Sequence, residues 1–233
     1  MRIGVIAPEF PPMLGGMAEL ARGLVTALAA TDQVRVHTLP GHGVAGGVEG
    51  PWMDGVPVRG RPAVDAATLP RGETDVWLLL NAGLAPLARH LDAPTFCYLH
   101  GNDFTNPWLA CGPRWFEALR RPYAARLRHA LRRRSIRRQL PVVRHLLTNS
   151  HQTAALIRDR LRVGSERISV VHPGVHDDFF QDGEPAATTT DEPAPLRVLT
   201  VTRLTRHTRR KNVEGVLRAV ASLTHGAEPI PIH

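Results

Sequence analysis

Arg203 and Lys211 have the residue types and the spacing to hold a diphosphate. Arg203 directly follows a strand predicted over 197–202, and Lys211, the only lysine in the sequence, directly precedes a helix predicted over 212–223. An arginine can donate two parallel hydrogen bonds, a lysine adds a point charge, and a helix amino terminus offers unpaired N–H groups. The two residues are therefore predicted to form a diphosphate clamp, with a solvated basic loop as the alternative.

His100 and Asp103 form a second group, at the end of a strand predicted over 95–100. Ligands of open α/β sheets bind at the carboxyl ends of the strands, and Gly101 is expected to leave room for one there. The stretch 98–108 (YLHGNDFTNPW) is rich in His, Asn, Asp and Trp, which favours a polar, hydroxylated ligand. We take His100 and Asp103 as candidate catalytic residues, with a purely structural role for the histidine as the alternative.

Gly15 and Gly16 form a third group, in a loop between a strand predicted over 1–7 and a helix predicted over 17–30. The positive end of a helix dipole attracts phosphates, and a residue without a Cβ lets the backbone approach a ligand closely. We therefore expect Gly15 and Gly16 to contact a phosphate. A simple turn is the alternative, because the loop has neither the G-x-G-x-x-G fingerprint nor the G-K-[ST] of a P-loop.

The elements that must position these residues alternate between strands and helices. Short apolar or β-branched runs predict the strands, and apolar residues at helical spacing predict the helices. Their order predicts an α/β fold with a Rossmann-like, doubly wound, mostly parallel sheet and helices on its faces. The further strands are predicted over 33–39, 56–59, 75–80, 145–149 and 168–171, the further helices over 82–91, 113–140 and 151–161, and a loop over 40–55.

Two domains are predicted. Residues 1–180 hold the elements of the first, and residues 181–195 are acidic, rich in Pro and Thr and without apolar periodicity, which is typical of a linker. Residues 196–233 begin a second Rossmann-like domain with one strand and one helix, which are too few to bury a core. We expect this second domain to be incomplete.

The net charge of +8 is concentrated in the segment 114–144, which holds eleven arginines and one acidic residue, Glu117. Its arginines are expected either to be solvated or to dock on an anionic membrane surface, peripherally at the inner face of the membrane. Nucleic-acid binding is not expected, because few aromatic residues are interleaved for base stacking. The helix predicted over 113–140 is expected to have one apolar face, made of Leu119, Tyr123, Leu127 and Leu131, and to carry arginines on its other faces.

The composition, with 43% hydrophobic and 21% charged residues, indicates a globular protein. No run approaches the roughly 18 apolar residues of a membrane span, and the first apolar stretch is too short for a signal peptide. A cytoplasmic location is therefore expected. Cys97 and Cys111 are predicted to be packing residues, and no C-x-x-C or H-E-x-x-H pattern predicts a metal site.

Five stretches, taken in order, resemble the retaining glycosyltransferases of family four. These enzymes have the GT-B fold of two facing Rossmann-like domains. The chain is similar to their N-terminal, acceptor-side domain followed by the opening of their donor-binding C-terminal domain. The matching stretches are APEFPPMLGGMAELARGL, YLHGNDFTNPW, LLTNSHQTAALI, ISVVHPGVHDDFF, and VLTVTRL followed by RRKNVEGVLRAVASL.

The resemblance implies a sugar transfer from a nucleotide-sugar donor to a hydroxyl acceptor, with retention of anomeric configuration and without a bound metal or other cofactor. It implies that Gly16 lies near the donor phosphates, that His100 contacts the donor sugar, and that Arg203 and Lys211 hold the donor diphosphate. The basic charge of the chain favours a sugar or a lipid-linked molecule as the acceptor. These expectations place the protein in glycan biosynthesis.

Two departures from the family pattern leave alternatives open. Positions 203 and 211 are eight residues apart, which is longer than the family spacing, so either the Arg203 loop carries an insertion or Arg206 is the partner of Lys211. The family's carboxylate-bearing E-x7-E segment would fall after position 233. The alternative function is therefore a truncated, non-catalytic binding module that needs a partner chain. A nicotinamide-dependent oxidoreductase is disfavoured, because the glycine fingerprint is missing.

Overall fold

The computed structural model describes residues 1–13, 15–38, 49–53, 56–60, 69–105, 122–175, 199–201 and 212–224. The chain forms two compact units, residues 1–175 and residues 176–233. The linker predicted over 181–195 lies outside the described residues, so the domain limits at 180 and 196 stay predictions. In the second unit, the described helix is α6 (Val213–Thr224), which matches the predicted helix over 212–223.

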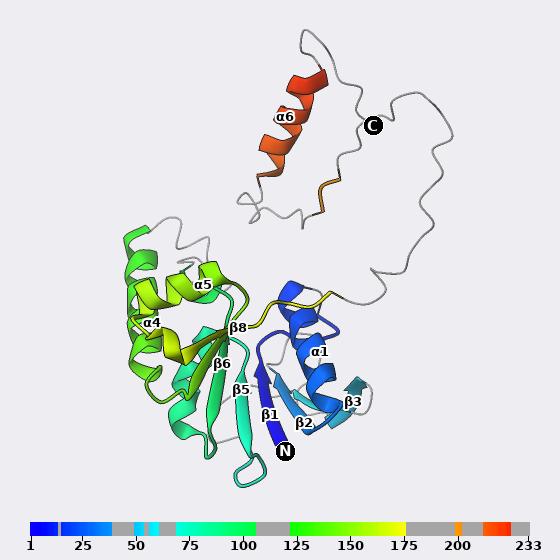
Figure 1. Ribbon diagram of the computed structural model, residues 1–233, viewed down its shortest axis with the longest axis vertical. Coiled ribbons are helices and arrows are strands. Elements are labelled where there is room, and N and C mark those ends of the chain that lie inside the picture. Colours follow the sequence, from blue (N-terminus) through cyan, green and yellow to red (C-terminus); the bar gives the residue numbers. More distant parts are fainter. Residues whose placement is uncertain are drawn as a thin grey trace, which may run out of the picture. The chain divides into compact units, whose positions relative to one another are not determined.

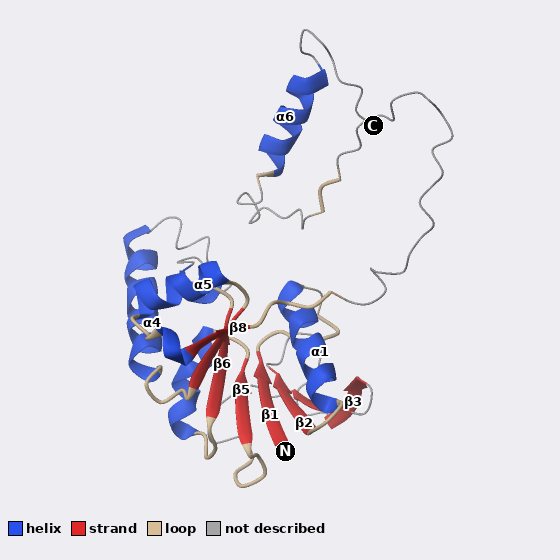
Figure 2. Cartoon of the chain, viewed as in Figure 1, coloured by secondary structure: helices blue, strands red, loops and turns tan. Residues whose placement is uncertain are grey.

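The first unit is built on one sheet (Figures 1 and 2). Its strands are β1 (Arg2–Ala7), β2 (Gln33–Thr38), β3 (Glu49–Met53), β4 (Val56–Gly60), β5 (Val76–Leu79), β6 (Thr95–Leu99), β7 (His145–Thr148) and β8 (Ile168–Val170). They lie in the order β3-β4-β2-β1-β5-β6-β7-β8. β3 is antiparallel to β4, and every other neighbouring pair among these strands is parallel. The predicted α/β class with a doubly wound, mostly parallel sheet is confirmed.

Helices cover both faces of this sheet. α1 (Gly16–Ala29) connects β1 to β2, as predicted. A 3-10 helix, η2 (Ala82–His90), connects β5 to β6, and α2 (Asn102–Thr105) follows β6. α4 (Pro122–Gln139) lies within the helix predicted over 113–140, and its first residue is a proline, which is tolerated in a first helical turn. The remaining elements are α5 (His151–Leu156), the π-helical turn η4 (Ile157–Leu161) and the 3-10 turn η5 (Ser165–Arg167).

The sheet separates two apolar clusters, which we name the α1-side core and the α4-side core. Alternation along β5 shows the division, since Leu78 joins the first cluster while Trp77 and Leu79 join the second. Cys97 is fully buried in the α4-side core, as predicted, and burial raises the pKa of its thiol. The α1-side core includes Ile3, Val5, Ala21, Val25, Val34 and Val36, and the α4-side core includes Ala82, Ala85, Phe104, Ile136, Leu140 and Leu146.

The prediction of a loop over 40–55 is wrong at residues 49–53, which form β3. Its Gly- and Pro-rich composition favours a turn, but β3 lies at the edge of the sheet, where a proline is tolerated because it leaves no central ladder bond unmade. Pro51 lies opposite Pro57 of β4, and a register shift follows between positions 51 and 53. Backbone pairing with β4 therefore decides the structure here.

Two members of the predicted apolar face of the basic helix, Leu127 and Leu131, face solvent. These side chains are 60% and 56% exposed, whereas Ile136 and Leu140 are 1% exposed and join the α4-side core. Ile136 lies five residues after Leu131, about 140° around a helix, so the two apolar stripes face different directions. Among the described side chains of these two stripes, those of the second join the α4-side core. The remaining members of the predicted face and the second predicted packing cysteine lie outside the described side chains: Leu119, Tyr123 and Cys111.

Candidate functional site

The strand order creates a topological switch point between β1 and β5. From β1 the chain continues through β2 to β4 on one side, and from β5 it continues through β6 and β7 to β8 on the other. In open α/β sheets, ligands bind outside the carboxyl ends of the strands at such a point. The loop leaving β1 leads to Gly15 and Gly16, and the loop leaving β5 begins with Leu80 and Asn81.

Gly15 and Gly16 lie at the amino end of α1, as predicted. Within the described part of the chain, no side chain caps this end. The helix begins with a hydrogen bond from the backbone N–H of Glu19 to the carbonyl oxygen of Gly15 at 3.0 Å. A Cβ on Gly16 would meet no atom within 4 Å, so the backbone is open to a ligand. The first-turn N–H groups therefore have the geometry of an anion site.

His100 follows β6 and lies half-buried beside the end of β5. Its Nε2 is 3.1 Å from the carbonyl oxygen of Leu80, and because a carbonyl can only accept, Nε2 donates. In the neutral ring, Nδ1 is then left as an acceptor. The ring contacts Tyr98 at a centroid distance of 5.1 Å, and the Tyr98 hydroxyl donates to the carbonyl oxygen of Val171 at 2.7 Å. These contacts hold the imidazole at the switch point.

Asp103 is a buried residue that contacts the backbone of His100. It is 3% exposed, and its Oδ2 accepts hydrogen bonds from the backbone N–H of Ala82 at 2.8 Å and of His100 at 3.3 Å. Its Oδ1 is buried without a hydrogen-bond partner among the described residues. The carboxylate thus ties the loop after β6 to the first turn of η2. This geometry supports a positioning role, exerted through His100.

Gly101 serves the turn rather than leaving room for a ligand. Its φ is +86°, a conformation that favours glycine. A Cβ there would lie 3.3 Å from the Oγ1 of Thr153, so a neighbouring side chain already fills the space. Its carbonyl oxygen accepts from the backbone N–H of Thr105 at 2.9 Å. The expectation of free space at Gly101 is therefore wrong.

A comparison with protein families identifies the family of the chain. The family model described as Glycosyltransferase Family 4 matches residues 14–179, a range that contains Gly16, His100 and Asp103. The chain belongs to glycosyltransferase family 4. The resemblance seen in the sequence is confirmed over this range. A comparison with curated proteins found no match.

Sequence reasoning missed a polar cluster at the same edge of this family-4 sheet. Asn149 follows β7, and its carbonyl oxygen accepts from the Nδ1 of His172, which follows β8, at 3.1 Å. The rings of His151 and His172 are 5.8 Å apart between centroids. The Oγ1 of Thr153 donates to the Oδ1 of Asn149 at 2.8 Å. A polar residue directly after an apolar strand is the signal that could have identified this cluster.

The remaining predicted residues of the family-4 site lie outside the described part of the chain. Arg203, Lys211 and the alternative Arg206 all fall in the range 202–211, and the diphosphate clamp stays a prediction. Among the described residues, no group of three or more His, Cys, Asp or Glu side chains is placed to hold a metal ion. None of the described helices combines the length and the apolar composition that crossing a bilayer requires.

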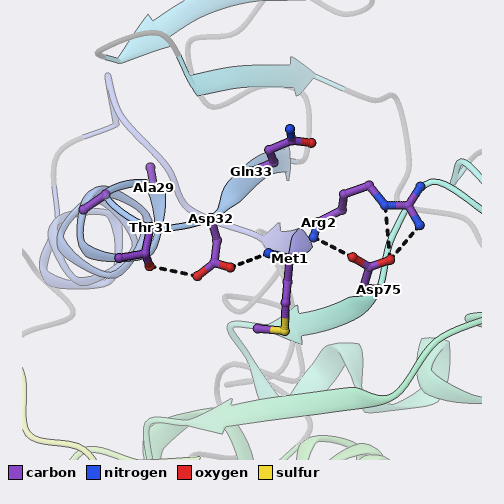
Figure 3. A pocket seen from close by; sticks show the side chains of 8 residues that line it. Met1, Arg2, Ala29, Thr31, Asp32, Gln33 and Asp75 are labelled. Atoms are coloured by element: carbon purple, nitrogen blue, oxygen red, sulfur yellow. Dashed lines mark hydrogen bonds and ion pairs between the residues drawn. The ribbon is translucent and has the colours of Figure 1, made fainter.

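A cavity of about 550 Å³ lies at the opposite, amino end of the strands (Figure 3). Its charged groups are paired with one another. The amino terminus of Met1 lies 2.6 Å from Asp32, and the Nη2 of Arg2 lies 2.6 Å from the Oδ1 of Asp75. Because ligands of open α/β sheets bind at the carboxyl edge, these pairs at the amino edge are expected to have a structural role.

Acid is expected to weaken the fold partly through Asp75. Hydrogen bonds from the Arg2 side chain, and then from its backbone N–H, hold the pKa of this carboxyl below its ordinary value of 3.8. A carboxylate with a lower pKa in the folded state stabilises the fold above its unfolded pKa, and this contribution is lost as the pH falls through the folded pKa. In urea titrations from about pH 5 to about pH 2, Asp75→Asn should lose less stability than the wild type. Identical acid dependence of the two proteins would contradict this assignment.

Proposed function

We propose that the protein is a retaining glycosyltransferase that moves a sugar from a nucleotide-sugar donor to a hydroxyl acceptor. One observation carries the proposal. At the topological switch point of a family-4 sheet, the Nδ1 of His100 is the acceptor nitrogen on the β5 side. The amino end of α1, which no described side chain caps, lies on the β1 side. A sugar hydroxyl fits the first group and a phosphate fits the second. A nucleotide-sugar contains both, and the proposal includes no metal cofactor.

The amino end of α1 acts on the leaving group. In the transfer, the bond between the anomeric carbon and the diphosphate oxygen breaks, and a bond to the acceptor oxygen forms. Negative charge develops on the diphosphate, which takes up the proton of the acceptor hydroxyl. The N–H groups at Gly16 and beyond, with their helix dipole, stabilise this charge. We propose Arg203 and Lys211 as further diphosphate ligands, because their side chains can bind phosphate groups. We propose retention of anomeric configuration because of the family resemblance.

His100 acts on the donor sugar. Its Nε2 is held by the Leu80 carbonyl, so Nδ1 accepts a hydrogen bond from a sugar hydroxyl and orients the anomeric carbon. Asp103 positions this ring by holding the backbone N–H of His100. The acceptor, a sugar or a lipid-linked hydroxyl, would reach the anomeric carbon from the same edge of the sheet.

Replacing His100 is expected to reduce transfer strongly while leaving nucleotide binding intact. His100→Ala should lower kcat about 100-fold, because orientation of the reacting carbon is lost. The affinity for the nucleoside diphosphate should change less than about threefold, because the phosphate contacts lie on α1. Transfer and donor hydrolysis would be measured with UDP-, GDP- and ADP-sugars, and nucleotide affinity by calorimetry.

His90→Ala is the matched control, because His90 is exposed at the far end of η2. It should behave as the wild type in both measurements. If His100→Ala retained full activity on a sugar that the wild type transfers, His100 would not contact the donor sugar. If the wild type bound none of the three donor classes, the proposed function itself would be wrong.

A further inference from the structure

Helix α4 presents one face to the first unit and the opposite face to solvent. It carries seven arginines and no acidic residue. The inner face includes Ile136, which is buried, and Gln139, whose Oε1 accepts a hydrogen bond from the Nε of Arg89 at 2.8 Å. Arg132 also lies on this side, against Gly83 of η2. The packing of α4 on η2 therefore determines which side chains point outward.

The outward face of α4 combines leucines with arginines. At about 100° per residue, Leu127, Leu131, Arg134 and Arg138 fall within an arc of about 60°, on the side opposite Ile136. All four side chains are exposed, the leucines by 60% and 56%. These two large apolar side chains are flanked by cations and do not belong to the described α4-side core. This arrangement is typical of a helix that lies in a membrane interface.

We propose that the outward face of α4, made of Leu127, Leu131, Arg134 and Arg138, docks on an anionic lipid bilayer. The leucines would enter the boundary between headgroups and acyl chains, and the arginines would bind lipid phosphates. Charge complementarity favours this occupant, because α4 has no carboxylate to repel the lipid phosphates.

Two other occupants fit this face less well. A second copy of the chain would bring the same arginines together across a two-fold interface, and like charges repel. A nucleic acid would bind the arginines but would gain nothing from two exposed leucines, and none of the four side chains of this face carries an aromatic ring for base stacking. An anionic bilayer can bind the leucines through its acyl chains and the arginines through its phosphates.

Vesicle co-sedimentation of the full chain tests the proposal. The vesicles contain either phosphatidylcholine alone or phosphatidylcholine with about 30% phosphatidylglycerol, whose negative charge attracts basic segments. Leu127→Ser/Leu131→Ser should lower the partition coefficient at least tenfold. Arg134→Gln/Arg138→Gln should lower it about 25-fold, or about fivefold per arginine. The matched controls, Leu217→Ser and Arg158→Gln/Arg160→Gln, replace exposed residues of the same types elsewhere and should bind as the wild type.

Each other outcome overturns the proposal. It is wrong if the wild type does not bind the anionic vesicles or binds neutral vesicles equally well. It is also wrong if the leucine variant binds as the wild type while remaining folded by circular dichroism. Binding to a single-stranded RNA oligonucleotide that depends on the arginines but not on the leucines would assign the face to nucleic acid. Leucine-dependent dimerisation in sedimentation velocity would assign it to a second copy of the chain.

Discussion

Gly4→Ala is expected to destabilise the first unit by about 3 kcal/mol, at the upper end of the usual cost of overpacking a core. Gly4 pairs with Trp77 across β1 and β5, and a Cβ on Gly4 would lie 2.5 Å from the Cε3 and Cζ3 atoms of the indole ring. The ring has little freedom to move. It is fully buried, contacts His37 at a centroid distance of 5.5 Å and donates through Nε1 to Asp92 at 3.3 Å.

Gly23→Ala is the matched control, because the substitution is the same and the environment is the opposite. Gly23 lies within α1, and a Cβ there would meet no atom within 4 Å. It should raise the free energy of unfolding by about 0.5–1 kcal/mol through helix propensity. Urea unfolding of both variants checks the pair. A Gly4→Ala variant within about 0.5 kcal/mol of the wild type would mean that Trp77 moves aside.

Asp103→Ala is expected to cost about 3 kcal/mol of stability, because it leaves the N–H groups of Ala82 and His100 without their charged acceptor. Asp103→Asn should cost less, about 1–2 kcal/mol, because an amide oxygen can still accept. Both values come from chemical unfolding. Equal stability of the alanine variant and the wild type would mean that water replaces the carboxylate.

The activity of Asp103→Asn separates a positioning role from a purely structural one. If Asp103 acts through His100, Asp103→Asn should lower kcat about tenfold in the wild type and leave the residual activity of His100→Ala nearly unchanged. Independent effects would multiply instead. A multiplicative result would show that Asp103 contributes to transfer by another route, and an unchanged kcat would show that it supports only the fold.

Most of the sheet could be predicted from the sequence, because its strands are short apolar runs between clear breaks. The runs at β1, β5 and β6 are buried on both faces, which gives the continuous apolar pattern of a parallel sheet. Parallel order then places the ends of these strands at one edge. The positions of Gly15, Gly16 and His100 at that edge follow from this rule.

The features that sequence reasoning missed depend on contacts between distant segments. β3 forms by pairing with β4, although its composition favours a loop. The helix α4 has two apolar stripes, and the position of η2 decides which one is buried. The partners of His100 and Asp103 are backbone groups, the carbonyl of Leu80 and the N–H of Ala82, which have no signature in a sequence.

The division of the apolar interior places the helix that begins at Gly16 and the Asp103 that positions His100 on different cores, although Tyr98, which contacts the His100 ring, belongs to the α1-side core. Gly16 begins a helix that rests on the α1-side core, whereas Asp103 is followed directly by Phe104 in the α4-side core. Substitutions that do not touch one another usually have additive effects. If the proposed site is correct, selection can therefore change the residues around Asp103 to accept a new donor sugar while the phosphate contacts proposed at Gly16 are kept, which is a route to diversification within one scaffold.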